Sequence, residues 1–282
     1  MLPYSIYLPD SDRNGVLFNS PHSGTILPQD FLEQVAIDPA LLLYSGDTLV
    51  DQLIQDVPRH GAIRFINHFA RIYVDTNRSP REIDADMFLD PPKVPAFLRT
   101  DKVARGFGVI SRKSYNGLEV YDRKLPKGEI NLRLAQAYHP THQALRDLLQ
   151  DLYQARGFYI MIDCHSMPSY GFIDPSLATS QQADLIIGNR FNTSCHDALS
   201  QHVADYFRQQ GLEVTFNVPY AGGYNTEHYG NRDQRQQALQ LEFNRALYLD
   251  EKHLSPNENF LALQETLTRL SENLNMHLPH LC

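Results

Sequence analysis

The sequence predicts an α/β fold, a sandwich of helices around a mostly parallel sheet. Short apolar segments alternate with amphipathic segments along most of the 282 residues, and this order is typical of parallel strands that are connected by helices. Several of the short segments are apolar at consecutive positions, as expected for strands that are buried on both faces.

Seven strands are expected, each of them a short apolar run. In chain order they cover Val16–Asn19, Ala62–Ile66, Ile72–Val74, Phe158–Asp163, Leu185–Gly188, Val214–Val218 and Leu239–Phe243. Four amphipathic segments are expected to form helices. They cover Asp47–Gln55, Thr141–Gln154, His196–Gln209 and Asn259–Leu274. In the second of these, four leucines lie on one side at helical spacing, so that side should face the core.

Residues 79–130 depart from this alternation. They contain a proline-rich segment, Asp90–Pro95, and scattered glycines. The stretch is too long for a plain connection, and long insertions in compact domains are often functional loops. The length of the chain suggests one large domain or two small ones. We expect a single domain, residues 1–282, with a loop-rich insertion at about 79–130.

The composition excludes several classes of protein. Hydrophobic residues make up 42% and charged residues 21%, which is enough apolar material to bury a core. No run approaches the roughly 18 apolar residues of a membrane span, and the first residues do not resemble a secretory signal. Three cysteines cannot form a disulfide framework, so we expect a reducing cytoplasm. The net charge of −8 argues against nucleic acid as a partner.

Two of the expected strands run into a histidine. His22 follows the first strand, and His165 follows the strand that begins at Phe158. In open α/β sheets, sites form beyond the carboxyl ends of the strands, and a neutral imidazole is a good zinc ligand. Each histidine could instead cap a turn or be hydrogen-bonded in the core, but two in matching positions favour a metal site.

A catalytic zinc ion usually has three protein ligands, and the third could be a carboxylate. Asp47 begins an expected helix, where its ordinary role would be that of an N-cap, and Asp51 is a competing carboxylate one turn later. Asp163 precedes His165 by two residues and should point to the same side of the strand. Its carboxylate could accept a hydrogen bond from a metal-binding histidine and orient that ring, or Asp163 could simply be the residue at which the strand ends.

Arginines and a late glutamate suggest a hydrolytic site. Arg71 and Arg78 are the first and last residues of a segment that is polar at both ends and apolar in between. A guanidinium suits a substrate carboxylate or an oxyanion, although surface ion pairs are its ordinary alternative. Glu242 is embedded in an apolar strand, where burial would raise its pKa and suit it to take a proton from metal-bound water. It could otherwise pair with Arg245 or another cation.

A glycine-containing loop, Asn217–Tyr224, follows the sixth expected strand. Adjacent glycines permit backbone conformations that side chains forbid. The loop could therefore wrap a small substrate, or it could merely turn.

Taken in order, these segments resemble the N-formylglutamate amidohydrolase (N-formylglutamate deformylase) family. The matching segments are Asn19–Gly24, Gly46-Asp47, Arg71 with Val74–Arg78, Asp163–Ser166, Asn217–Gly223 and Gln240–Arg245. The family is related to zinc carboxypeptidases and to aspartoacylase. The resemblance implies a phosphorylase/hydrolase-like, three-layer α/β/α fold with a mixed, mostly parallel sheet. It also implies zinc hydrolase activity on N-acyl amino acids.

The resemblance assigns a role to each site residue. The residues that resemble the ligands of one zinc ion are His22, Asp47 and His165. Glu242 resembles the general base, and Arg71 resembles the arginine that polarises the scissile carbonyl. The residues expected to bind the substrate are Asn77 and Arg78, which resemble the pair that grips its α-carboxylate, and Tyr220, Gly222 and Gly223.

The carboxylate ligand departs from the carboxypeptidase pattern. That pattern has a glutamate three residues after the first histidine, and Thr25 stands there in this chain. We choose Asp47 over Asp51 because Gly46-Asp47 resembles the deformylase pattern.

The implied activity is the cleavage of N-formyl-L-glutamate to L-glutamate and formate, a step of histidine degradation. Two alternatives stay open: a zinc amidase or carboxypeptidase that acts on peptides or cell-wall fragments, and a non-catalytic binding protein of the same fold. Arg81, Arg112 and Tyr220 are available to read the substrate side chain. The acyl group, the native metal and the oligomeric state are not fixed by the resemblance.

Overall fold

The computed structural model describes residues 2–91, 97–169 and 183–281. Cys282 and residues 92–96 of the expected insertion lie outside the described residues. The chain divides into two compact units. The first, here called the loop unit, comprises Met1–Ser5, Pro21–Gly46 and Asn67–Leu145, and the second, the sheet unit, comprises Ile6–Ser20, Asp47–Ile66 and Arg146–Cys282. Because the chain passes between them five times, we propose that they fold together as a single domain.

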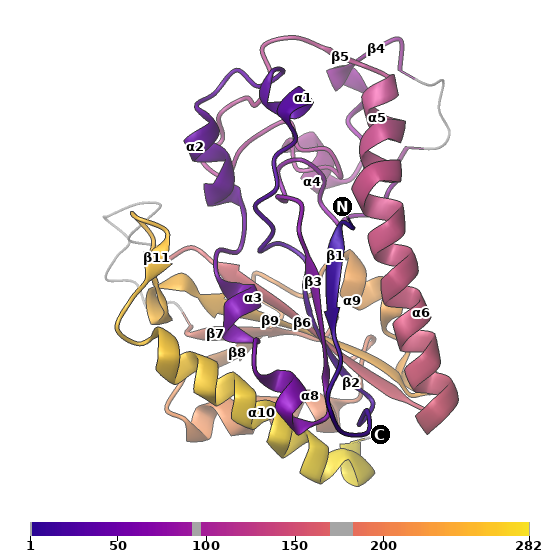
Figure 1. Ribbon diagram of the computed structural model, residues 1–282, viewed down its shortest axis with the longest axis vertical. Coiled ribbons are helices and arrows are strands. Elements are labelled where there is room, and N and C mark those ends of the chain that lie inside the picture. Colours follow the sequence, from indigo (N-terminus) through magenta and orange to yellow (C-terminus); the bar gives the residue numbers. More distant parts are fainter. Residues whose placement is uncertain (1, 92–96, 170–182, 282) are drawn as a thin grey trace. The chain divides into compact units, whose positions relative to one another are not determined.

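The fold is α/β with a mixed, mostly parallel seven-stranded sheet in the order β1-β3-β2-β6-β9-β7-β8 (Figure 1). The strands are β1 (Tyr4–Tyr7), β2 (Val16–Ser20), β3 (Ile63–Asn67), β6 (Tyr159–Met167), β7 (Leu185–Gly188), β8 (Val214–Phe216) and β9 (Gln236–Asn244). Strand β2 is parallel to β3 and β6, β6 is parallel to β9, and β7 is parallel to β8. Strand β7, by contrast, pairs with β9 in the antiparallel direction.

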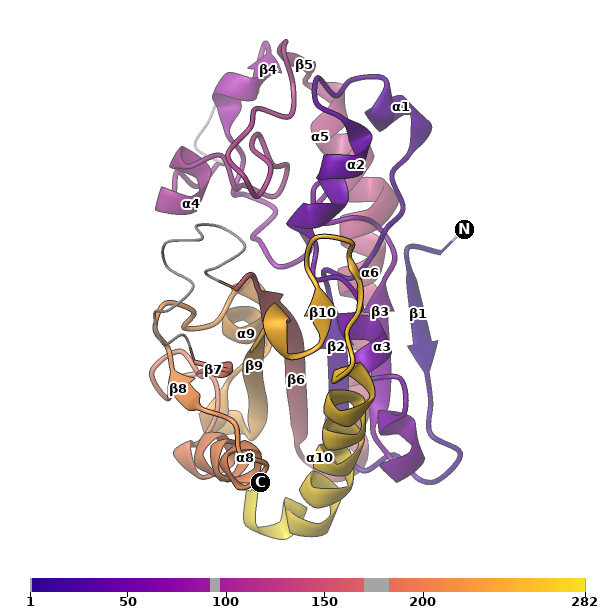
Figure 2. The same cartoon turned by 90° about the vertical axis from the view of Figure 1, so that its left-hand side faces the viewer.

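Helices cover both faces of the sheet. The helices of the sheet unit are α3 (Val50–Leu53), α8 (Asp197–Gln209), α9 (Tyr224–Tyr229) and α10 (Phe260–Leu281), and α6 (His139–Arg156) runs into it. Figure 2 shows α8 and α10 on one side of the sheet, whereas α9 contacts β6 and β9 from the other. A short hairpin of β10 (Leu249–Asp250) and β11 (Ser255–Pro256) precedes α10.

The core lies between the sheet and α3, α8 and α10. Strand residues that point to this face, such as Phe18, Ile162 and Leu241, are fully buried. Leu267 and Leu274, two turns apart on α10, are fully buried against them, as the helical period requires. The period of a strand is two, so the intervening residues of β2, β6 and β9 point to the opposite face. The polar residues of the candidate site belong to that second face.

The loop unit contains short elements. They are α1 (Gln29–Leu32), α2 (Pro39–Leu42), β4 (Phe88–Leu89), α4 (Asp101–Ala104), β5 (Leu125–Pro126) and α5 (Gly128–Arg133). A π-helical turn, Leu134–Tyr138, joins α5 to α6, and β4 pairs with β5. Three of these elements, β4, α4 and β5, belong to the stretch for which an insertion was expected, and α5 begins in it.

A buried arginine organises the loop unit. Arg133 is fully buried, and its guanidinium lies over the rings of Phe31, Tyr73 and Tyr121, about 5 Å from the nearest centroid. It forms an ion pair with Glu129 at 2.9 Å and donates to the main-chain oxygen of Tyr73. This cation therefore fixes the segment that leads to Asp75.

Three sequence predictions need correction. Ile72–Val74 is a turn rather than a strand, because the amides of Tyr73 and Val74 both bond to the oxygen of Ala70. The strand expected at Val214–Val218 ends at Phe216, since Asn217 has a φ of 62°. The helix expected at Asp47–Gln55 is only Val50–Leu53.

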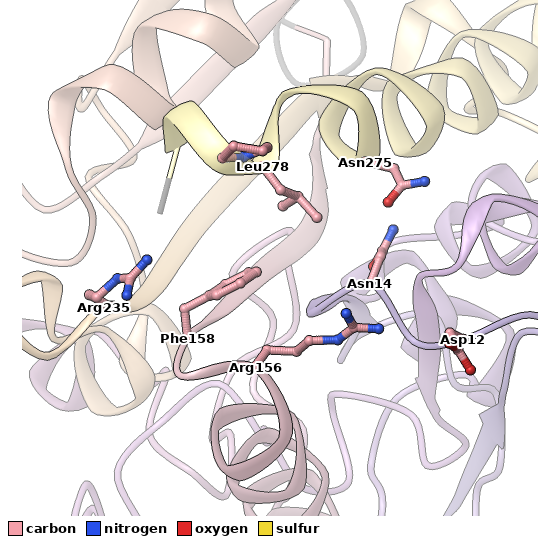
Figure 3. Close-up of a pocket in the computed structure, with 8 residues that line it drawn as sticks. Asp12, Asn14, Arg156, Phe158, Arg235, Asn275 and Leu278 are labelled. Atoms are coloured by element: carbon pink, nitrogen blue, oxygen red, sulfur yellow. The ribbon is translucent and has the colours of Figure 1, made fainter.

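A surface cavity of about 440 Å³ lies at the amino-terminal end of β6 (Figure 3). It is lined by Phe158 and by two arginines, Arg156 and Arg235. His165 lies near the other end of the same strand, so this cavity is separate from the candidate site. No helix among the described residues is long and apolar enough to cross a membrane.

Candidate active site

Three buried side chains offer ligand atoms to one point. His22, Asp47 and His165 each contribute one such atom, and these atoms all lie within 4.8 Å of one another. Each residue is at most 2% exposed. Two imidazole nitrogens and one carboxylate oxygen are a donor set of catalytic zinc sites. The residues therefore fit a divalent metal ion, and the described part of the chain contains no second group of this kind.

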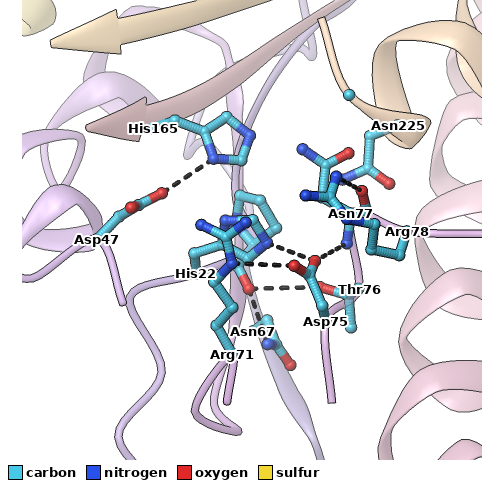
Figure 4. A network of polar contacts seen from close by, with 12 residues as sticks. His22, Asp47, Asn67, Arg71, Asp75, Thr76, Asn77, Arg78, His165 and Asn225 are labelled. Atoms are coloured by element: carbon cyan, nitrogen blue, oxygen red, sulfur yellow. Dashed lines mark hydrogen bonds and ion pairs between the residues drawn. The ribbon is translucent and has the colours of Figure 1, made fainter. Parts of the chain in front are cut away.

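His165 lies between two carboxylates. Its Nδ1 lies 2.9 Å from Asp47 Oδ2 (Figure 4), and its Nε2 lies 2.9 Å from Asp163 Oδ2. Asp163 also accepts a hydrogen bond from Asn19 Nδ2 at 2.6 Å. Burial alone would lower the pKa of His165, but the two carboxylates outweigh it and raise that pKa well above its ordinary value. Asp163 thus points to the same side of β6 as His165, as the strand period predicts.

Asp47 is not an N-cap. Helix α3 begins at Val50, and the cap position is taken by Leu49 with a φ of 64°. The carboxylate of Asp47 instead contacts His165 and lies 3.4 Å from Arg245 Nη2. Arg245, which the sequence offered as a partner for Glu242, thus lies beside Asp47. Asp51 does not belong to the ligand group.

His22 is oriented by Asp75. Its Nε2 lies 2.8 Å from Asp75 Oδ1, while Arg71 Nε donates to Asp75 Oδ2 at 2.9 Å. The charges of His22 and Arg71 hold the pKa of Asp75 well below its ordinary value although burial would raise it. A carboxylate behind a histidine fixes its tautomer and ring orientation, as is usual for metal-binding histidines.

A close approach of two chain segments explains the glycine of the Asn19–Gly24 motif. A Cβ at Gly24 would lie 2.4 Å from main-chain atoms of His68 and Phe69. Asn67 Nδ2 donates to the oxygen of Pro21 at 2.9 Å. These contacts fix the main chain directly around His22.

Asn77 and Arg78 follow Asp75 in a buried loop. The amide of Asn77 donates to Asp75 Oδ1 at 2.8 Å, and Arg78 Nε donates to the oxygen of Phe107 at 3.1 Å. Both side chains are more than nine-tenths buried. The hydroxyl of Tyr138 donates to the oxygen of Arg78 at 2.7 Å, so the π-helical turn before α6 holds this loop in place.

Glu242 lies beside His165 on the neighbouring strand. The parallel register of β6 and β9 places these two residues opposite each other, and paired residues point to the same face of a sheet. Glu242 is 7% exposed and accepts a hydrogen bond from Gln240 Nε2 at 2.8 Å. The residue expected from the sequence to be the general base is therefore a buried carboxylate next to a candidate ligand histidine.

The glycine loop is joined to Glu242 through one side chain. Gln240 Oε1 accepts a hydrogen bond from the amide of Gly223 at 2.7 Å, while its Nε2 donates to Glu242. Gly222 has a φ of 120°, which favours glycine. Tyr220, in the same loop, is 37% exposed.

The sequence prediction missed Asp75 as a functional residue. It lies in the Val74–Arg78 segment of the motif set, but its role depends on a contact with His22, 53 positions away. Of the arginines suggested as side-chain readers, Arg112 forms ion pairs with Asp84 and Glu119 at 3.1 and 2.9 Å.

Comparison with known proteins identifies the family of this chain. A family model described as N-formylglutamate amidohydrolase matches residues 14–249. Curated N-formylglutamate deformylases from Pseudomonas aeruginosa and Pseudomonas putida are each 26% identical and match 85% of this chain and 84% and 83% of their own lengths. The crystal structure of N-formylglutamate amidohydrolase from Ralstonia eutropha JMP134 is 31% identical, with a TM-score of 0.92 over 99% of both chains. The chain belongs to the N-formylglutamate amidohydrolase family.

Proposed function

We propose that this protein is a zinc-dependent amidohydrolase that cleaves N-formyl-L-glutamate to L-glutamate and formate. The observation that carries the proposal is the pairing of His165 with Glu242 across β6 and β9, beside a three-ligand group. This arrangement places a buried carboxylate next to a candidate metal site. The names of the relatives supply the substrate.

His22, Asp47 and His165 would hold the metal ion. A bound zinc ion would supply a Lewis acid and a water of lowered pKa. Two further carboxylates would strengthen the affinity for the metal ion, because each orients one of the histidines. Asp75 orients His22, and Asp163 orients His165.

Glu242 would act as the general base. Its carboxylate accepts the proton of the attacking water and later passes it to the leaving amine nitrogen. The hydrogen bond from Gln240 fixes one carboxylate oxygen, which leaves the orientation of the group defined before substrate binds. Such preorganisation lowers the cost of reaching the transition state.

Arginines would bind the anionic groups of the substrate. Arg71, which Asp75 orients through Nε, would donate to the scissile carbonyl oxygen as negative charge develops there. Asn77 and Arg78 would hold the α-carboxylate. Tyr220 and the Gly222–Gly223 backbone would line the substrate-binding site, because the amide of Gly223 is hydrogen-bonded to Gln240, the residue that also contacts Glu242. We place the reaction in histidine degradation in the cytoplasm.

The experiment measures formate release from N-formyl-L-glutamate by purified protein. The same protein is assayed after chelator treatment and after zinc is added back. We expect release that is lost with chelator and restored by zinc. Release that survives complete metal removal would overturn the metal dependence, and no release from a folded, zinc-loaded protein would overturn the substrate.

A further inference from the structure

We propose that Lys102 is the residue that recognises the side-chain carboxylate of the substrate. This inference rests on the proposed function, because it assumes an N-formyl amino acid whose α-carboxylate is bound by Arg78. N-formylglutamate carries two carboxylates, and the residues assigned so far account for one. A second cation near Arg78 is therefore required by the chemistry of the substrate.

Hydrogen bonds place Lys102 beside the Arg78 loop. Lys102 is the second residue of α4, and its main-chain oxygen accepts a hydrogen bond from the amide of Phe107 at 2.8 Å. The oxygen of Phe107 in turn accepts from Arg78 Nε at 3.1 Å. Two consecutive hydrogen bonds thus connect the backbone of Lys102 to the guanidinium of Arg78.

A second connection fixes the start of α4. Thr100 is its N-cap, with its hydroxyl accepting from the amide of Val103. The same hydroxyl donates to Glu82 Oε1 at 2.8 Å, while Glu82 Oε2 accepts from the amide of Ser79 at 2.9 Å. Because Ser79 follows Arg78 directly, hydrogen bonds attach α4 to the Arg78 loop at Thr100 as well as at Lys102.

Lys102 shares its electrostatic surroundings with two arginines, Arg71 and Arg78, and with two carboxylates, Asp75 and Glu82. Asp75 forms an ion pair with Arg71, and the two oxygens of Glu82 accept hydrogen bonds from Thr100 and Ser79. A lysine ammonium in such surroundings attracts an anionic ligand.

Lys102 is exposed and available to a ligand. Within residues 2–91, 97–169 and 183–281, no carboxylate lies within ion-pair distance of its ammonium group. Arg112, by contrast, is committed to Asp84 and Glu119. A lysine is a point charge on a flexible stem, which suits the carboxylate at the end of a flexible glutamate side chain.

The test compares N-formyl-L-glutamate with N-formyl-L-glutamine, which has nearly the same shape and no side-chain charge. Both substrates are assayed with wild type, Lys102→Met and Lys102→Arg. Lys124→Met serves as a matched control, since Lys124 is an exposed lysine of the same unit. We expect Lys102→Met to lower kcat/KM for the glutamate substrate by about 10-fold or more, mainly through KM.

The same variant should leave the glutamine substrate within about twofold of wild type, and Lys102→Arg should retain most of the preference for glutamate. Equal losses on both substrates, or an unchanged preference in Lys102→Met, would overturn the proposal. If wild type cleaves neither substrate, the proposed function fails. The role of Lys102 is then decided by calorimetric binding of L-glutamate and L-glutamine to the zinc-loaded protein. A preference for L-glutamate that Lys102→Met abolishes supports the role, and equal binding of both amino acids by wild type overturns it.

Discussion

Asp163 and His165 lie two residues apart on β6 and are joined by a 2.9 Å contact between Asp163 Oδ2 and His165 Nε2. The contact is possible because alternate residues of a strand share one face. Asn19, which pairs with Asp163 in the register of β2 and β6, holds the carboxylate from its other oxygen. The strand thereby supplies a candidate metal ligand together with the group that orients it.

Asp163→Asn should weaken metal binding while the fold is kept. The amide preserves the shape of the side chain but removes the charge that orients and polarises His165, and such outer partners are usually worth about 10- to 100-fold in metal affinity. The measurement is competition for zinc with a chelator of known affinity. Asp151→Asn, at an exposed position of α6, is the control. Equal zinc affinity in wild type and Asp163→Asn would show that Asp163 makes no contribution to metal binding.

Glu242→Gln should separate metal binding from catalysis. Glutamine keeps the shape of the side chain but cannot accept the water proton, so kcat should fall by at least ~10²-fold. Zinc content, measured on the purified variant, should stay at one ion per chain. Glu258→Gln, at an exposed position, controls for the loss of a negative charge. Wild-type activity in Glu242→Gln would remove Glu242 from the mechanism.

Part of this architecture could be predicted from the sequence because buried strands have a local signature. β7 is apolar throughout its first three residues, β2 and β6 begin with consecutive apolar residues, and in β9 apolar residues alternate with polar ones. Each of these strands was expected within a few residues of its observed bounds. The segment Ile72–Val74 has the same signature but forms a turn, since Tyr73 is buried against Phe31 and Phe69 rather than in a sheet. Local hydrophobicity indicates burial, and tertiary contacts decide which element is buried.

The candidate site could also be predicted only in part, because some of its residues follow from local sequence patterns and others from tertiary contacts. The strand ends pointed to His22 and His165, because the carboxyl ends of parallel strands gather at one edge. The partners of these histidines could not be inferred in this way. Asp75 is 53 positions from His22, and Asp47 is 118 positions from His165. Asp47 also precedes a helix, so the local pattern favoured a cap.

Arg78→Ala should weaken the binding of substrates that carry an α-carboxylate. The loss of a charged, hydrogen-bonding group should raise KM by about 10-fold or more, whereas a substrate with an α-carboxamide should be little affected. The measurement is the ratio of kcat/KM for N-formyl-L-glutamate and its α-amide. Arg156→Ala, at the opposite end of β6, is the control. Equal loss on both substrates would refute the assignment of Arg78 to the α-carboxylate.

The preference for N-formyl-L-glutamate over N-formyl-L-glutamine should decline at alkaline pH. Although the side chain of Lys102 reaches solvent, partial desolvation by the surrounding protein and the charge of Arg78 lower its pKa below the ordinary value. The carboxylates of Asp75 and Glu82 act in the opposite direction, and Arg71 adds to the effect of Arg78. Only the protonated amine attracts a carboxylate, so recognition is present at neutral pH and is lost as the pH rises through this lowered pKa.

The measurement is the ratio of kcat/KM for the two substrates between about pH 7 and 10.5, a range that ends at the ordinary pKa of lysine. Changes that act on the reaction itself cancel in this ratio, because both substrates share the same scissile bond. In Lys102→Arg the guanidinium stays charged throughout this range, so the preference should persist to the highest pH. A ratio that is constant in wild type, or that falls equally in wild type and Lys102→Arg, would assign the side-chain preference to a residue other than Lys102.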